Sequence, residues 1–252
     1  MKVGILGTGN IGRTLARKLS AAGYEIEVAN SRGPETIPAE VTEFGARAVT
    51  SAEAVAEAVA DAHVVILSIP LCSIVAIAPL LQGLPADTVI IDTSNYYPQR
   101  DGTIDAIEAG QAESEWVSEQ LGRPVAKAWN AIGADSFAKK GRPEGAHDRI
   151  AIPVAANNAR DCNVAMALVH DTGLDAVKAG TLAQSWRQQP GAPCYCTDLT
   201  HLEIPAALAA AERDRLPTRR DLAFSAIAER VGDSTSNPDM DYNMRLTRAL
   251  FM

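Results

Sequence analysis

Positive charge is in short supply in this sequence. The 23 Lys and Arg residues are outnumbered by 31 Asp and Glu residues, which gives a formal net charge of −8 at pH 7. Proteins that bind nucleic acids or anionic membrane surfaces need clustered positive charge to meet the phosphates. The charge balance therefore argues against both kinds of partner.

Cysteine is also scarce, with 4 residues in a chain of 252, at positions 72, 162, 194 and 196. The first residues, Met1 to Gly7, have the pattern of a strand rather than of a signal peptide. So few thiols without a signal sequence are typical of a reduced, cytoplasmic protein. Only Cys194 and Cys196 are close together, and they lack the second ligand pair of a zinc site. We expect a cytoplasmic protein that binds no metal.

Long apolar runs are missing too. The longest, residues 63–81, is interrupted by Ser68, Pro70, Ser73 and Pro79. A membrane-spanning helix needs about 20 consecutive apolar residues, and proline breaks the hydrogen bonding of a helix interior. We expect a buried strand and a buried helix here, and no membrane partner. The 47% hydrophobic and 21% charged residues are ordinary for a folded globular chain without repeats.

Short apolar segments alternate with segments of helical periodicity along the first 180 residues. This alternation is typical of a parallel sheet flanked by helices. It predicts an α/β fold with a doubly wound, Rossmann-type, mainly parallel sheet. The predicted strands are residues 2–7, 25–30, 46–49, 63–69, 88–92, 124–129, 150–155 and 174–178.

The strand pattern stops beyond residue 180. Helical composition continues over residues 202–215 and 218–231, and an amphipathic segment follows over 239–252, behind a linker over 232–238. Residues 139–149 are polar and rich in Gly and Pro, which predicts an exposed loop. We expect a doubly wound domain over residues 1–180 and a helical C-terminal region over 181–252.

A glycine-rich turn joins the first predicted strand to the first predicted helix. Residues 7–12 read Gly-Thr-Gly-Asn-Ile-Gly, the GxGxxG pattern of dinucleotide-binding folds. Gly7 allows the tight turn, Gly9 lets backbone amides approach a pyrophosphate, and Gly12 lets the helix pack on the strand. The helix N-terminus offers unpaired N–H groups to the anion. A turn without a ligand is the alternative, but the context favours dinucleotide contacts from Gly7, Thr8, Gly9, Asn10, Ile11 and Gly12.

The end of the second predicted strand selects between NAD and NADP. An NAD site places Asp or Glu there to accept from the ribose 2′-hydroxyl, whereas NADP requires this carboxylate to be absent. The sequence has Asn30, Ser31 and Arg32 instead. Arg32 is suited to pair with a 2′-phosphate and to stack on adenine, and Ser31 to donate to the same oxygens. NADP(H) is the predicted cofactor, and a solvated loop arginine is the alternative.

Polar or small residues follow three further predicted strands, where the crevice of a doubly wound sheet opens. We expect cofactor contacts from Ser68, Ile69, Pro70, Thr93, Ser94, Asn95 and Asn130. Turn and capping chemistry is the alternative for each of them. For Asp92, which precedes Thr93, capping of the next element is nearly as well supported as ligand contact.

A proton donor for ketone or imine reduction is not recognisable in the sequence. Such reductions need a positioned acid, but His63 begins a strand, at the wrong edge of the sheet, and the other histidines lie in loop or helix settings. No Tyr or Lys stands in a recognisable acid motif. Hydride transfer to a flavin-like ring needs mainly the face-to-face placement of two ring systems. We therefore expect a small-molecule, flavin-like acceptor and assign no catalytic side chain.

Together these motifs resemble the NADP-dependent reductases of the deazaflavin coenzyme F420 and their relatives, including the cytosolic domain of membrane ferric reductases. The resemblance covers roughly residues 1–196, through the segments 7–12, 30–32, 64–70, 92–95, 125–130 and 152–155. It implies direct hydride transfer between NADPH and a flavin or deazaflavin held as second substrate in the same cleft. The family places a second basic residue shortly after the arginine, whereas here Gly33, Pro34 and Glu35 follow Arg32.

Two other functions stay open. A β-hydroxyacid dehydrogenase or imine reductase has a similar first half, but the hydroxyacid class uses a Lys four residues before an Asn on a long helix. Lys127 and Asn130 are three apart and on a predicted strand. A non-catalytic NADP-binding redox sensor is the third possibility.

The segment 239–252 concentrates apolar side chains, namely Met240, Met244, Leu246, Leu250 and Phe251. Burying four or five of them at about 1.5 to 3 kcal/mol each outweighs much of the ordering cost of a short helix. The segment should therefore dock, either on its own subunit or on a neighbour. We expect a homodimer, the commonest assembly of soluble chains.

Overall fold

The computed structural model describes residues 1–53, 62–232 and 239–252, and its centre is one eight-stranded sheet. The strand order is β3-β2-β1-β4-β5-β6-β7-β8, in which β6 and β7 run antiparallel and every other neighbouring pair is parallel. The first six strands follow the 3-2-1-4-5-6 order of the Rossmann fold. The predicted doubly wound, mainly parallel α/β sheet is confirmed.

Each of the eight strands overlaps one of the eight predicted segments, with different bounds. They are β1 Lys2–Leu6, β2 Glu25–Ala29, β3 Arg47–Ala48, β4 Ala62–Leu67, β5 Val89–Asp92, β6 Ala126–Lys127, β7 Ala151–Ala156 and β8 Asp175–Lys178. β6 is much shorter than the predicted 124–129. It ends early because Trp129 takes a left-handed backbone conformation with φ 55°, which extended strands do not contain.

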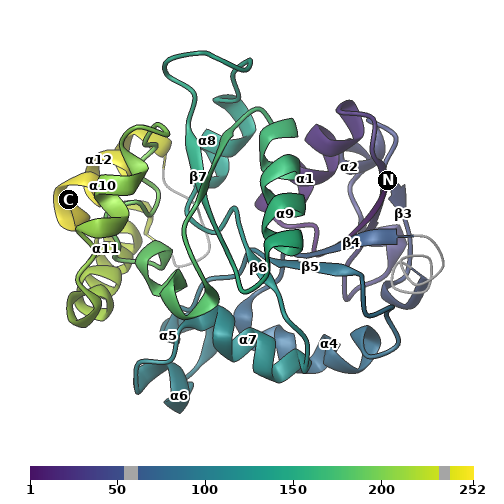
Figure 1. Ribbon diagram of the computed structural model, residues 1–252, viewed down its shortest axis with the longest axis horizontal. Coiled ribbons are helices and arrows are strands. Elements are labelled where there is room, and N and C mark those ends of the chain that lie inside the picture. The colour runs from purple at the N-terminus through teal and green to yellow at the C-terminus, as the bar shows by residue number, and fades with distance from the viewer. Residues whose placement is uncertain (54–61, 233–238) are drawn as a thin grey trace.

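Helices cover both faces of the sheet (Figure 1). The α-helices are α1 Asn10–Ala21, α2 Ala39–Thr42, α4 Ile74–Leu81, α5 Pro98–Asp101, α6 Asp105–Glu108, α7 Glu113–Leu121, α8 Ala134–Lys139, α9 Ala159–Asp171, α10 Ile204–Ala209, α11 Leu216–Val231 and α12 Met240–Phe251. Short 3-10 helices are Pro34–Thr36, Leu71–Ser73, Leu182–Gln188 and Arg213–Arg215. Within the described ranges, no helix is long and apolar enough to cross a membrane.

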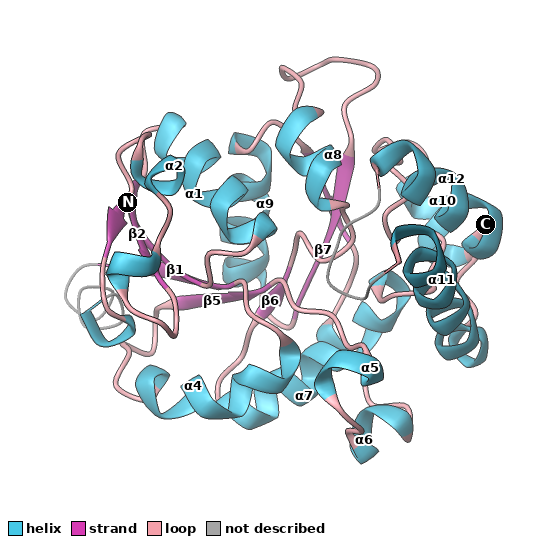
Figure 2. Ribbon diagram, turned by 180° about the vertical axis from the view of Figure 1, so that it is seen from behind, coloured by secondary structure: helices cyan, strands magenta, loops and turns pink. Residues whose placement is uncertain are grey.

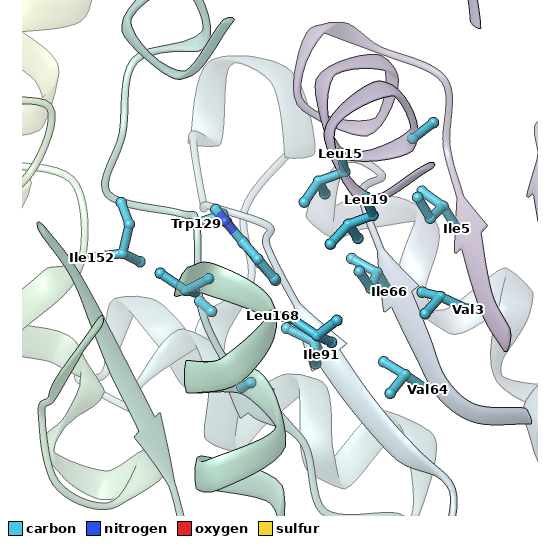
Figure 3. Close-up of a cluster of buried hydrophobic side chains, with 14 of the residues drawn as sticks. Val3, Ile5, Leu15, Leu19, Val64, Ile66, Ile91, Trp129, Ile152 and Leu168 are labelled. Carbon is cyan, nitrogen blue, oxygen red and sulfur yellow. The ribbon is translucent and has the colours of Figure 1, made fainter. Parts of the chain in front are cut away.

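The core lies in two clusters, one on each face of the sheet. Alternate residues of a strand point to opposite faces, and Ile5 belongs to the cluster under α1 and α9 whereas Leu6 belongs to the cluster over α4 and α7. Figure 3 shows Leu15 and Leu19 of α1 beside Ile66 of β4. These α1 side chains are fully buried, as the helical spacing predicts. Because helices cover both faces of the sheet, a ligand site can open only at the ends of the strands.

The C-terminal region is helical, and α10, α11 and α12 gather on the side of the sheet where β7 lies (Figures 1 and 2). The predicted helix over 202–215 is wrong as one piece, because the chain forms α10, then a separate 3-10 turn at 213–215. The predicted helix at 218 begins two residues earlier, at Leu216, with Pro217 in its first turn. The predicted loop over 139–149 is confirmed beyond Lys139, the last residue of α8. Apart from Gly232, the predicted linker lies outside the described residues.

The amphipathic segment docks as predicted, on its own chain. Phe251 is 2% exposed and packs with Tyr195, Cys196, Ala131 and Ala223. Leu250 is partly buried against the same cluster, whereas the side chain of Met240 lies outside the described part. The burial of Phe251 within one chain removes part of the reason for expecting this segment to reach a neighbour.

Candidate functional site

A large cleft opens at the carboxyl ends of the parallel strands. Its volume is about 1500 Å³, and it is lined by the N-terminus of α1, the loops after β4, β5 and β6, and residues of α11 and α12. Ten predicted contact residues line it, namely Gly9, Asn10, Ile11, Ser68, Ile69, Pro70, Thr93, Ser94, Asn95 and Asn130. The cleft lies at the switch point between β1 and β4, where doubly wound sheets bind their ligands.

The glycine turn between β1 and α1 has the geometry that its three glycines require. Gly7 has φ +108°, and a Cβ there would lie 2.0 Å from the Ser68 carbonyl oxygen. A Cβ on Gly12 would lie 2.0 Å from the Gly7 carbonyl oxygen, so helix and turn are in direct backbone contact. A Cβ on Gly9 meets nothing within 4 Å. Gly7 and Gly12 therefore serve the packing, and the space beside Gly9 is open to a ligand.

The N-terminus of α1 has no side-chain cap and no acidic residue in its first turn. The first N–H groups of a helix have no intrahelical partner, and the helix dipole places partial positive charge there. Since Gly9 leaves room in front of these groups, the turn fits the pyrophosphate of a dinucleotide.

The loop after β2 is organised by Asn30. Its Oδ1 accepts from the Arg32 backbone N–H at 2.9 Å, and its Nδ2 donates to Thr36 Oγ1 at 3.0 Å and to Thr8 Oγ1 at 3.3 Å. The Asn30 side chain thus ties the glycine turn to this loop. Ser31 and Arg32 are exposed, and the described part of the chain offers the Arg32 guanidinium no side-chain partner.

Six predicted contacts do not line the cleft itself: Gly7, Thr8, Gly12, Asn30, Ser31 and Arg32. Gly7, Thr8 and Gly12 build the turn, and the other three form the loop beside it. Arg13 and Glu40, which do line the cleft, form an ion pair at 2.8 Å. The sequence reasoning did not single out this pair.

A buried ionic cluster lies under the loop after β5. Lys127 Nζ lies 2.8 Å from Asp92 Oδ2, and both side chains are fully buried. The other carboxylate oxygen of Asp92 accepts from the backbone N–H of Ser94 at 2.8 Å and from its hydroxyl at 2.6 Å. Asp92 is therefore a structural residue that shapes the turn after β5.

Glu113, at the start of α7, lies 4.0 Å from Lys127 Nζ. Burial raises the pKa of this carboxyl from its ordinary 4.5 to about 7, although the positive charge of Lys127 acts in the opposite direction. Its Oε2 atom has no hydrogen-bond partner in the described structure.

Asn95 and Asn130 join the loops after β5 and β6. Asn130 Nδ2 donates to Asn95 Oδ1 at 3.1 Å, and Asn95 Nδ2 donates to the Asn130 backbone oxygen at 2.9 Å. Gln188 Nε2 donates to Asn130 Oδ1 at 2.9 Å. These bonds occupy most of the hydrogen-bonding groups of both asparagine side chains. The first role of the two asparagines is therefore to hold the cleft wall in place.

The structure brings Tyr97 and Tyr195 together in the cleft wall, with Arg100 and Arg220 nearby. All four side chains line the cleft, and the two phenol oxygens lie 2.8 Å apart. The sequence reasoning missed this cluster, because the two tyrosines are separated by 98 positions and neither lies in a local motif. The sequence shows no tyrosine in an acid motif, yet the fold places this pair of phenols in the cleft wall.

No group of three metal-ligating side chains is placed to hold a metal among the residues that the structure describes. None of the cleft-lining residues in this part of the chain is a histidine. His147 is almost fully exposed, and His201 lies 3.2 Å from Asp175.

The chain is similar to proteins of one family. The model for NADP oxidoreductases, coenzyme F420-dependent, matches residues 2–96. The protein YjhV of Escherichia coli (strain K12) is 34% identical over 103 residues, which are 41% of this chain and 74% of YjhV.

Two solved structures are similar to this chain in fold. A hypothetical protein from Sinorhizobium meliloti has a TM-score of 0.67 and 28% identity, over 79% of this chain and 95% of the other. A candidate F420-dependent NADP reductase from Arthrobacter sp. FB24 has a TM-score of 0.58 and 19% identity, over 94% and 97% of the two chains. The second likeness concerns the fold alone. With the family match and its glycine turn, the chain belongs to the coenzyme F420-dependent NADP oxidoreductase family and is an NADP-dependent oxidoreductase.

Proposed function

We propose that this chain transfers a hydride between NADP(H) and a flavin or deazaflavin bound in the same cleft. The observation that carries the proposal is the extent of that cleft, which continues from Gly9 to the aromatic wall formed by Tyr97, Tyr195 and Phe224. Its volume of about 1500 Å³ exceeds the roughly 300–1,000 Å³ of a site for one small molecule. A dinucleotide and a second ring system fit this size.

The cofactor contacts divide into two groups in this proposal. The open backbone at Gly9 and the first turn of α1 hold the pyrophosphate. The exposed Arg32, beside a loop organised by Asn30, holds the 2′-phosphate. Ser68 to Pro70, Thr93 to Asn95 and Asn130 border the space left for the nicotinamide.

The test is NADPH oxidation against a panel of riboflavin, FMN, deazaflavin, ferric chelates, imines and ketones. We expect flavin or deazaflavin reduction, with direct movement of deuterium from stereospecifically labelled NADPH to an acceptor that retains it. Reduction of imines or ketones alone, with no flavin turnover, would refute the proposal.

A second candidate, reduction of a small carbonyl compound or imine, is favoured by the paired phenols of Tyr97 and Tyr195. Hydroxyl groups in the cleft are suited to donate a hydrogen bond to the oxygen or nitrogen that gains electrons in such a reaction. The same panel distinguishes the two candidates.

We also propose that this chain has a nucleotide-binding domain over residues 1–180 and that residues 181–252 complete the acceptor cleft. We further propose that the protein is a homodimer and that it works in the cytoplasm. In this proposal Leu202 and Leu222, two exposed leucines of the C-terminal region (79% and 53% exposed), take part in the dimer contact. All four cysteines are free thiols, as in reducing compartments. Analytical ultracentrifugation tests the dimer, and a Leu202→Ser/Leu222→Ser variant should shift it toward the monomer. A monomeric wild-type protein at micromolar concentration would contradict this assembly.

A further inference from the structure

Two tyrosine hydroxyls meet in the cleft wall, and they come from distant parts of the chain. Tyr97 follows β5, in the loop that also carries Asn95, and Tyr195 belongs to the segment before α10. Their phenol oxygens lie 2.8 Å apart, which is hydrogen-bonding distance, and both residues line the cleft.

Both rings are held by aromatic neighbours on the C-terminal helices. The Tyr97 ring lies 6.1 Å from the Phe224 ring of α11, and the Tyr195 ring lies 6.5 Å from the Phe251 ring of α12. The Arg100 guanidinium lies over the Tyr97 ring at 5.5 Å. Packing on these sides restricts the rings to one orientation, so the hydroxyl pair is pre-formed before a ligand arrives.

The direction of the bond within the pair decides whether a donor is left over: when Tyr97 donates to Tyr195, the Tyr195 hydroxyl has the Cys196 thiol as a further partner, and when Tyr195 donates, the Tyr97 proton is left over. Each phenol carries one O–H donor, and the bond between the two oxygens uses only one of them. When Tyr195 donates to Tyr97, the Tyr97 proton has no acceptor among the described residues. A polar atom of a ligand in the cleft would satisfy it.

The two hydroxyls keep their protons at neutral pH. Burial raises the pKa of Tyr97 and that of Tyr195, and the nearby carboxyl of Glu113 acts in the same direction. Neutral phenols in the wall of a site are suited to donate hydrogen bonds to developing negative charge. They are poor sources of a fully transferred proton.

We propose that Tyr97, oriented by Tyr195, donates a hydrogen bond to the carbonyl oxygen of the hydride acceptor, the oxygen that gains negative charge as the hydride arrives. This inference rests on the proposed function for the hydride step. The acceptor class is a molecule whose carbonyl is conjugated with, or is itself, the reducible centre. Isoalloxazine and deazaflavin rings have such a carbonyl, and so do simple ketones.

The electrons balance in this step without any further reactant. The C–H bond of the dihydronicotinamide breaks with its electron pair, and a new bond forms at the electrophilic atom of the acceptor. The electron pair of the acceptor's conjugated double bond moves to its carbonyl oxygen. NADPH is oxidised to NADP⁺, the acceptor gains two electrons, and the resulting anion, held by the Tyr97 hydroxyl, takes its proton from water.

The experiment compares Tyr97→Phe, Tyr195→Phe and the control Tyr242→Phe with the wild-type protein, using riboflavin and 5-deazariboflavin as probes. Tyr242 is a suitable control because its hydroxyl donates to the Ala226 backbone oxygen at 3.3 Å and the residue does not line the cleft. We expect Tyr97→Phe to lower kcat about 10- to 100-fold, between the value of one neutral hydrogen bond and that of an oxyanion donor. KM for NADPH should stay within about twofold, since the phenol is not assigned to the nucleotide.

A second readout follows the bound acceptor directly. In the complex with NADP⁺, the carbonyl stretching band of bound riboflavin should move to higher frequency in Tyr97→Phe, because the hydrogen bond is lost. Tyr195→Phe should give a smaller loss of kcat and a broadened band, since the Tyr97 hydroxyl then lacks its orienting partner. Tyr242→Phe should match the wild-type protein in both measurements.

The outcomes separate the two proposals. Flavin reduction by the wild-type protein with an unchanged rate and band in Tyr97→Phe overturns the inference and leaves the proposed function intact. A wild-type protein that reduces ketones but no flavin overturns the proposed function, and the same variants then test the hydrogen bond with the ketone. Equal losses in Tyr97→Phe and Tyr242→Phe would also overturn the inference.

Discussion

The ammonium nitrogen of Lys127 lies 2.8 Å from the Asp92 carboxylate, and neither side chain reaches solvent. The pair joins the carboxyl ends of β5 and β6, directly beneath the loop that carries Thr93 and Ser94 into the cleft. Lys127 also donates to the Ser94 backbone oxygen. The wall of the cleft thus depends on an ion pair that does not itself line the cleft.

Removal of the Lys127 charge should destabilise the protein strongly. In Lys127→Met, the Asp92 carboxylate is left buried without its counter-ion, and losing one partner of a buried pair costs about 3–5 kcal/mol. Urea denaturation should show this loss in the free energy of unfolding. Lys178→Met, at an exposed position of β8, is the control and should stay near the wild-type value. The double variant Lys127→Met/Asp92→Asn should recover part of the loss, and no recovery would contradict the pairing argument.

Glu113 should make the stability depend on pH. Its pKa is raised from 4.5 to about 7 in the folded protein, so between these values the unfolded chain releases the proton while the folded chain keeps it. Stability therefore falls as the pH rises through this window, by about 3 kcal/mol at most. Glu113→Gln should remove this slope and be more stable than the wild-type protein at pH 8, as measured by denaturation at a series of pH values. Glu119→Gln, exposed on the same helix, should keep the wild-type slope.

Arg32 should distinguish NADPH from NADH. Its guanidinium is exposed beside the loop that Asn30 organises, and one charge-assisted contact to the 2′-phosphate corresponds to roughly 10- to 100-fold in affinity. Arg32→Ala should therefore raise KM for NADPH by this factor and leave KM for NADH nearly unchanged. Steady-state kinetics with both cofactors checks this, and an equal loss with both would exclude a 2′-phosphate contact.

Substitutions at two glycines of the turn should have different effects, one on nucleotide binding and the other on stability. A side chain at Gly9 enters open space, and the residue has an ordinary φ of −69°. Gly9→Val should keep the wild-type melting temperature but bind neither NADPH nor NADH in calorimetric titrations. A Cβ at Gly12 would lie 2.0 Å from the Gly7 oxygen, so Gly12→Ala should lose roughly 1–3 kcal/mol of stability through overpacking. If Gly9→Val lost stability but still bound the nucleotides, the turn would not face the nucleotide.

The sequence was sufficient for the sheet and for the cleft lining around the glycine turn and the strand ends. Buried strands such as Val64 to Leu67 and the glycine turn are local patterns, and parallel topology brings their ends together. The tyrosine pair could not be predicted, since Tyr97 and Tyr195 lie in loops and meet only through tertiary packing. The early end of β6 was missed for a related reason, because the left-handed backbone of Trp129 depends on its buried surroundings rather than on its own residue type.

Because α12 packs against the wall of the cleft, this wall is completed late in biosynthesis. Thr247 Oγ1 donates to the Cys196 backbone oxygen and Arg248 Nε to that of Thr197, each at 2.8 Å, while Phe251 supports the Tyr195 ring. Chains emerge from the ribosome N-terminus first, so the glycine turn is available long before α12 is made. The nascent chain can therefore form the side of the cleft at the glycine turn early, but it completes the packing around Tyr195 only after α12 has been translated. The two sides of the cleft therefore form at different times during synthesis.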